Sequence, residues 1–280
     1  MEEQKLKHGT LYVVGTPIGN LGDMSPRAVS VLGGVDFIAA EDTRVSLKLL
    51  NHFGIKKPLV SYHEHNKRER GAEIIHRLQN GETAAIVTDA GMPCISDPGE
   101  DLVRLCRENN VCVEVVPGPA ALISALAVSG LVTSRFSFEG FLSVNRRSRF
   151  EHLESIKADT HTLIFYEAPH KLLSTLQDML KVLGDRRISI SRELTKLHEE
   201  TISTTLSESV RHFSEHPPKG EFVLVIEGAK KEDAPQLSFE DAVGMVKQRI
   251  LEGASSSDAA KAVAKETGFK KGELYKAALS

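Results

Sequence analysis

The segment TLYVVGTPIGNLGDMSPRAVSVL, residues 10–32, starts with an apolar run and continues into a loop rich in glycine. Leu11–Val14 is typical of a buried β-strand. Ser25 is a favourable N-cap residue and Pro26 suits the first helical position, so we expect a helix over residues 25–32. A strand, a glycine-containing loop and a helix in this order indicate the start of a parallel β-sheet.

The same alternation continues as far as residue 116. Further strands are predicted at residues 36–40, 58–62, 84–87 and 111–116, and helices at residues 45–53, 67–79 and 100–109. Strands that alternate with helices of this length predict an α/β domain, in which helices cover both faces of a mostly parallel sheet.

Pro117-Gly118-Pro119 interrupts the pattern and marks an expected domain boundary. Beyond it we expect a mixed sheet, because residues 187–192 and 201–205 are separated by too few residues for a crossover helix and should pair antiparallel. Other strands are predicted at residues 136–141, 162–166 and 222–226, and helices at residues 120–128, 146–156, 169–182 and 206–213.

Residues 229–236 are polar and contain proline, which predicts a linker. Three short helices are expected after it, at residues 239–251, 257–267 and 271–279, and resemble a helix-turn-helix module. The predicted fold is therefore two α/β domains, residues 1–117 and 118–229, followed by a small C-terminal helical domain, residues 237–280.

The composition is that of an ordinary soluble globular protein, with 41% hydrophobic residues, 26% charged residues and a net charge of −3. Any nucleic acid must then be bound by local basic clusters. Residues 1–8 lack the apolar core of a signal peptide, and the longest nearly apolar stretch, residues 120–132, is too short to cross a bilayer. Three cysteines without a C-x-x-C pair argue against a disulfide framework. We expect a reduced, cytoplasmic protein without a membrane partner.

Three loops follow predicted strands of the first domain, where an open parallel sheet binds its ligands. Gly15–Asp23 would let a ligand approach the backbone, although a simple turn has the same composition; it lacks the G-x-G-x-x-G pattern of dinucleotide sites. Ala40–Arg44 places acidic residues where ribose hydroxyls are often bound, or only caps the next helix. Thr88–Gly99 is long for such a unit, which favours a function.

His63-Glu64-His65 has two imidazoles that would share one face of a strand. A third nearby ligand is missing from the sequence around them, and the helical H-E-x-x-H arrangement is absent. We therefore predict no metal site.

At these loops the sequence resembles the tetrapyrrole methylase family of S-adenosylmethionine-dependent enzymes. Within that family it is similar to the branch that methylates the ribose 2′-hydroxyl of a decoding-centre cytidine in 16S ribosomal RNA. The motifs are residues 16–23, 40–44, 63–66, 88–99, 117–121, 139–142, 165–170, 192–196 and 220–223. Pro17 and Asn20 depart from the usual first loop of porphyrin-precursor methylases, as they do in the RNA branch. Ala120 and Lys171 replace the Ser and Arg usual in that branch.

The resemblance implies a homodimer with the methyl donor, S-adenosyl-L-methionine, held in a cleft between two α/β domains. Its partner would be 16S ribosomal RNA within the small ribosomal subunit. The donor-site residues that it implies are Pro17, Asp89, Ala90, Gly91, Met92, Ile95, Ala120, Ala121, Tyr166 and Leu197.

A ribose hydroxyl is a weak nucleophile until its proton leaves, so a carboxylate or imidazole is expected as general base. The candidates are Asp23, Glu41, Asp42 and His63, among which the sequence does not choose. Arg44 is expected beside them.

Several arginines are candidates for RNA contacts. Arg27 and Arg44 would suit phosphates because a guanidinium binds them bidentately. Arg146, Arg147 and Arg149 form a basic cluster that would contact RNA or simply lie in solvent.

Three other functions stay open at this point. A porphyrinoid methyltransferase would share the fold and the donor. A non-catalytic ribosome- or RNA-binding protein would need the basic clusters but not three ligand loops. A nicotinamide-dependent oxidoreductase would fit the first strand and loop but not the missing glycine pattern.

Overall fold

The computed structural model describes residues 6–230 and 238–279. The N-terminal residues 1–5, most of the predicted linker (residues 231–236), and the two end residues of the predicted tail, 237 and 280, lie outside the described part. By its internal contacts the chain divides into two compact units, residues 1–157 with 161–228 and residues 158–160 with 229–280. The first unit holds both β-sheets, and the boundary at residues 117–118 stays a prediction.

The first sheet is entirely parallel, with strand order β3-β2-β4-β1-β5. Its strands are β1 (Thr10–Val14), β2 (Phe37–Ala40), β3 (Leu59–Ser61), β4 (Ala84–Val87) and β5 (Cys112–Val116). The helices between them are α1 (Pro26–Gly34), α2 (Thr43–His52), α3 (Lys67–Gln79) and α4 (Gly99–Glu108), and a 3-10 turn, η1 (Leu21–Asp23), precedes α1.

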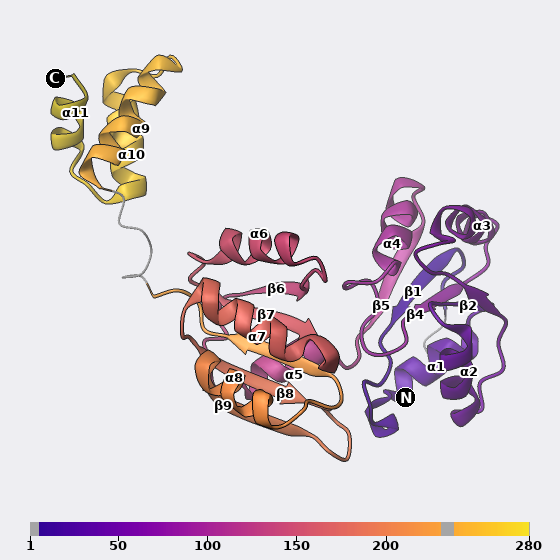
Figure 1. Ribbon diagram of the computed structural model, residues 1–280. Helices are drawn as coiled ribbons and strands as arrows, with labels where there is room; N and C mark the ends of the chain where they lie inside the picture. The colour runs from indigo at the N-terminus through magenta and orange to yellow at the C-terminus, as the bar shows by residue number, and fades with distance from the viewer. Residues whose placement is uncertain (1–5, 231–237, 280) are drawn as a thin grey trace. The chain divides into compact units, whose positions relative to one another are not determined.

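Alternating side chains divide the core of this sheet between its two faces. On one face Tyr12 and Val14 pack with residues of α1 and α2, and on the other Leu11 and Val13 pack with residues of α3 and α4. Figure 1 shows α1 and α2 on one side of this sheet and α3 and α4 on the other. The predicted cap is confirmed, because the Ser25 side chain accepts a hydrogen bond from the backbone of Ala28.

The second sheet is mixed, with strand order β6-β7-β10-β8-β9. Its strands are β6 (Phe136–Phe141), β7 (Thr162–Glu167), β8 (Arg187–Arg192), β9 (Glu200–Thr205) and β10 (Phe222–Ile226). Helices α6 (Arg146–Ile156), α7 (Pro169–Leu183) and α8 (Leu206–Glu215) contribute to the core on one face, and α5 (Ala121–Val128) packs on the other (Figure 1). The antiparallel pairing of β8 and β9 confirms the prediction from their short connection.

Helices α9 (Phe239–Leu251), α10 (Ser256–Thr267) and α11 (Lys271–Leu279) form the second unit around a small apolar core that includes Val246, Val263 and Leu274. Ser238 and Asp241 form a capping box at the start of α9. Within the described residues no helix is both long and apolar enough to cross a membrane.

A candidate active site at the strand ends

A cleft of about 530 Å³ lies in the α/β unit, where loops after the first sheet meet the ends of strands of the second. Because β1, β2, β4 and β5 are parallel, the loops after them emerge at one edge of the sheet. Residues of all four loops line the cleft. The residues singled out from the sequence that line it are Glu41, Ala90, Gly91, Met92, Ile95, Ala120, Ala121 and Tyr166.

Glycines hold three of these loops in backbone contact. The amide of Thr16 donates to the carbonyl of Gly91 at 2.9 Å, and the amide of Gly91 returns a bond to Thr16 at 3.2 Å. A Cβ atom on Gly15 would lie 2.7 Å from the Cα of Gly118, so neither position has room for a side chain. These contacts explain why the loops need glycine at these positions.

The loop after β4 is strained and internally bonded. Cys94 and Ser96 have positive φ angles of 70° and 64°, which costs a residue with a side chain about 1 kcal/mol or more. The carboxylate of Asp97 accepts from the amides of Ile95 and Gly99 at 3.1 and 2.8 Å. The loop is therefore fixed in shape, as expected of a loop that binds a ligand.

The acidic candidates after β2 differ in their surroundings. Glu41 lines the cleft and accepts from the hydroxyl of Thr88 at 2.9 Å. Asp42 caps α2, and its hydrogen bonds from the side chain and backbone of Arg44 hold the pKa of this carboxyl well below its usual range. Asp42 is thus a weak proton acceptor, and Arg44 is occupied as its partner although its side chain is exposed.

Other candidates lie outside the lining of the cleft. Asp23 is exposed on η1, and His63, whose Nδ1 is buried without a hydrogen-bond partner, follows β3. Burial raises the pKa of Asp89, whose carboxylate accepts from the amide of Asp42 at 3.2 Å. Pro17 is buried beside Thr16 in the first loop.

In the second half of the site the structure favours a different leucine from the one chosen in the sequence. Leu197 is 91% exposed and does not line the cleft, whereas Leu194 is buried and does. Both follow β8, and Leu197 was the one that the family resemblance implied.

Tyr166 on β7 is bonded to the start of α5, because its hydroxyl accepts a hydrogen bond from the amide of Leu122 at 3.1 Å. Burial raises the pKa of Tyr166, so its hydroxyl keeps its proton near neutral pH. Phe138 and Phe141 pack around the same ring, with centroids 5.0 and 5.5 Å away. Phe141 was not singled out as a site residue in the sequence, although it lies in the quoted motif over residues 139–142.

Carboxylates dominate the charge of the cleft. Four of its lining residues are acidic, Glu41, Asp97, Glu167 and Glu221, and none of the described residues that line it is basic. Glu167 is paired with Lys171 at 3.0 Å and Glu221 with Lys196 at 2.9 Å. Among the residues that the structure describes, no cation is paired with Glu41 or Asp97, so the cleft suits a ligand with a positive centre. Its volume is within the usual range for a small-molecule site, roughly 300–1,000 Å³.

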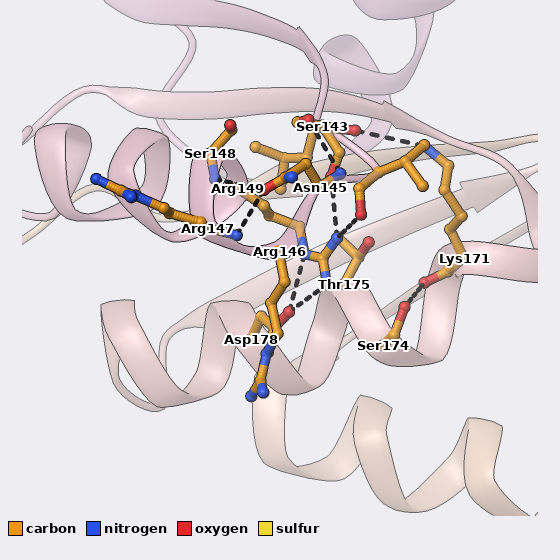
Figure 2. A network of polar contacts seen from close by, with 12 residues as sticks. Ser143, Asn145, Arg146, Arg147, Ser148, Arg149, Lys171, Ser174, Thr175 and Asp178 are labelled. Carbon is orange, nitrogen blue, oxygen red and sulfur yellow. Dashed lines mark hydrogen bonds and ion pairs between the residues drawn. The ribbon is translucent and has the colours of Figure 1, made fainter.

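The predicted RNA-binding arginines have different environments. Arg146 and Arg147 have exposed side chains at the start of α6. Arg149 is buried; its guanidinium donates to Asp178 at 2.7 and 2.8 Å and to the carbonyls of Ser143 and Val144 (Figure 2). Arg149 therefore stabilises the packing of α6 against α7, and its guanidinium is not available to bind a phosphate. Arg27 is exposed and donates to the carbonyl of Val115 at 3.3 Å.

The family model for Tetrapyrrole (Corrin/Porphyrin) Methylases matches residues 10–209, which span both sheets apart from β10. The chain belongs to this family. The family resemblance drawn from the loop motifs is thereby confirmed.

This tetrapyrrole methylase is similar over nearly its whole length to proteins called ribosomal RNA small subunit methyltransferase I. The relative from Synechocystis sp. is 49% identical, and the alignment covers 97% of this chain and 98% of the relative. The relative from Bacillus subtilis is 45% identical over 96% of this chain and 94% of its own.

Two solved structures share the fold of this chain. A uroporphyrin-III-C-methyltransferase from Thermus thermophilus superposes with a TM-score of 0.55 at 18% identity, covering 78% of this chain and 94% of the other. A diphthine synthase superposes with a TM-score of 0.59 at 13% identity, covering 78% and 89%. These likenesses confirm the predicted fold class of two α/β domains.

Proposed function

We propose that this chain is an S-adenosylmethionine-dependent methyltransferase that modifies RNA of the small ribosomal subunit. The observation that carries the proposal is the near full-length similarity to relatives with that printed name, at 49% and 45% identity. The acidic cleft supports it, because the donor carries a positive sulfonium. When bound, the donor supplies a methyl group already activated by the charge on sulfur.

Within the cleft, the residues after β4 would hold the donor. Ala90, Gly91, Met92 and Ile95 line the cleft, and Asp89 would support the start of this loop through its bond to the backbone of Asp42. Ala120, Ala121 and Tyr166 line the cleft as well. Pro17 would stiffen the first loop. Leu194 lines the cleft and Leu197 does not, so we propose no direct contact between Leu197 and the donor.

The proposed acceptor is the ribose 2′-hydroxyl of a cytidine in 16S ribosomal RNA. This oxygen must lose its proton as it attacks, and Glu41 is the acidic candidate that lines the cleft. The Thr88 hydroxyl, which donates to Glu41 at 2.9 Å, would fix the orientation of the carboxylate. Asp42, Arg44 and Asp23 would not take the proton in this proposal. They would instead contribute to the surroundings of the site.

For the RNA backbone we propose Arg146, Arg147 and Arg27, whose side chains are exposed. The homodimer, the assembled subunit as substrate and the cytoplasmic location stay predictions.

A methyl-transfer assay with labelled donor tests the proposal on three acceptors: small ribosomal subunits, protein-free 16S RNA and a tetrapyrrole precursor. We expect transfer to RNA and none to the tetrapyrrole. A reconstituted substrate whose target cytidine is replaced by 2′-deoxycytidine should bind and receive no methyl group. Methylation of that substrate would show that the base is modified, and transfer to the tetrapyrrole alone would overturn the RNA assignment.

The Glu41→Gln variant tests the proposed proton acceptor. Glutamine can still accept the hydrogen bond from Thr88 but cannot take a proton, so we expect kcat to fall by about 100-fold or more. Donor affinity, measured by calorimetry, should fall far less than kcat, because Asp97 still contributes a negative charge to the cleft. A kcat near that of the wild type would exclude Glu41 from proton transfer.

A further inference from the structure

Phe141 reaches the cleft because of an irregularity in β6. Strand β6 pairs with β7 in parallel register, but Phe138 is opposite Ile164 and Gly140 is opposite Phe165, so one residue, Glu139, is extra. In a regular strand Phe138 and Phe141 would point to opposite faces. The bulge places both on the face of Tyr166, and both contact its ring.

Gly140 makes this bulge possible, since its φ angle of 65° is in the left-handed region. The carboxylate of Glu139, the extra residue, lies 2.8 Å from Nε2 of His152. Bulges of this kind often redirect a side chain beside an active site.

The Phe141 ring is largely uncovered. It is 56% exposed although it lines the cleft and touches Tyr166, whereas the next residue, Leu142, is 2% exposed in the core. The ammonium of Lys171 lies 5.8 Å from the ring centroid. A fixed aromatic ring with an open surface at the edge of a cleft offers a platform for stacking a flat group.

The segment after Phe141 is held in place by buried polar contacts that Figure 2 shows together. Arg149 donates to the carbonyls of Ser143 and Val144 and is paired with Asp178 on α7. Lys171, in the first turn of α7, donates to the carbonyl of Leu142 at 3.4 Å and pairs with buried Glu167. The segment that follows Phe141 is therefore held by side chains of both α6 and α7. This restraint lowers the entropy cost of binding a ligand to the Phe141 ring.

Exposed cationic side chains lie at the start of α6, shortly after Phe141 in the sequence. Arg146 and Arg147 have side chains that are 69% and 88% exposed, and each has an acidic neighbour, Asp178 at 3.8 Å and Glu151 at 2.8 Å. An open aromatic ring followed by exposed arginines is the combination with which proteins bind unpaired nucleotides, through a stacked base and contacted phosphates.

We propose that Phe141 is the residue on which the base of the target nucleotide stacks, while its ribose enters the cleft beside Glu41. This inference rests on the proposed function and adds to it how the substrate is recognised. It requires the target nucleotide to be unpaired when it binds, because a base within a duplex has no free face.

The test compares Phe141 with a phenylalanine of the same strand. Phe136 is 39% exposed and does not line the cleft, so Phe136→Leu is the matched control for Phe141→Leu. Loss of one stacked base should lower kcat/KM for RNA about tenfold or more, mainly through KM, with unchanged donor affinity. Phe141→Tyr should restore the wild-type value, and Phe136→Leu should not differ from the wild type.

A second measurement does not depend on turnover. The chain contains four tyrosines and no tryptophan, so Phe141→Trp introduces a single tryptophan, which can be excited selectively and whose emission should be quenched when 16S RNA binds. Phe136→Trp should show little change.

Each outcome has a separate meaning. Equal effects of the substitutions at Phe141 and Phe136, or no quenching in Phe141→Trp, would overturn the stacking role. The proposed function would still stand if the wild type methylates RNA. A parallel loss of donor affinity in Phe141→Leu would assign the ring to the donor and overturn the inference. Failure of the wild type to methylate RNA would overturn the proposed function and this inference with it.

Discussion

Gly91 is the residue at which conformation and close packing act together. Its φ angle is 87°, and a Cβ atom there would lie 3.2 Å from Cγ2 of Ile18 and 3.4 Å from the carbonyl oxygen of Pro119. Loops from three different strands thus meet at a position where only glycine fits without displacement.

Replacing Gly91 tests whether this contact shapes the donor site. We expect Gly91→Val to lower donor affinity in calorimetry at least tenfold, and to lower the free energy of unfolding by roughly 1–3 kcal/mol through backbone strain. Gly54→Val is the matched control, since Gly54 has a φ angle of 68° and open space where a Cβ would be. The control should lose similar stability and keep its donor affinity. Equal donor affinities in the two variants would remove Gly91 from the donor site.

Among the elements, β2 and β4 are joined by a side chain directly before their first residues. Oδ2 of Asp36 accepts from both the amide and the hydroxyl of Thr83 at 2.7 Å, and the amide of Asp36 donates to Thr83. These bonds, first from the backbone and then from the side chain of Thr83, lower the pKa of Asp36. The carboxylate therefore helps to hold the register between β2 and β4. Glu41 follows β2, so its position relative to the loop after β4 depends on this register.

The pH dependence of this contact has a definite sign. A folded-state pKa below the unfolded value, about 3.9, adds stability above that pH and loses it as the pH falls through the folded-state value. We expect Asp36→Asn to lower the free energy of unfolding by about 0.5–1 kcal/mol at pH 7, because the partly exposed site weakens the bonds. In urea titrations the difference from the wild type should shrink as the pH falls below about 4. A difference that stays constant down to pH 2 would contradict the assigned charge effect.

At the scale of the whole molecule, the α/β unit and the helical unit have separate apolar cores. All described residues that line the cleft belong to the α/β unit. The relative from Thermotoga maritima is 49% identical over 220 residues, which is 99% of its own length but 79% of this chain. A shorter chain of about the size of the α/β unit thus exists among the relatives.

We expect a protein truncated after Gly228 to keep the donor affinity of the full chain. Its main thermal transition should shift by no more than a few degrees, because the apolar clusters of both sheets remain complete. Calorimetry and a thermal melt measured by circular dichroism check both quantities. A large loss of donor affinity would mean that the helical unit takes part in the donor site.

The local pattern of residues was enough to predict most helices and strands and their order along the chain. Residues 146–156 were expected to be a helix and are α6, and the pairing of β8 with β9 followed from the short connection between them. These features depend on periodicity, capping residues and turn lengths, all of which are local properties of the chain. The loop after β4 was recognised for a similar reason, since its length and composition are visible without a structure.

Which side chains come into contact was visible only in the folded chain. Arg149 was grouped with Arg146 and Arg147 by proximity in sequence, but Asp178, 29 residues further on, holds it in the interior. Phe141 reaches the cleft because one extra residue in β6 changes the face on which its ring lies. Contacts between distant segments, and a shift of a single residue in strand register, depend on the partner strand or helix, and the local pattern of a sequence does not record them.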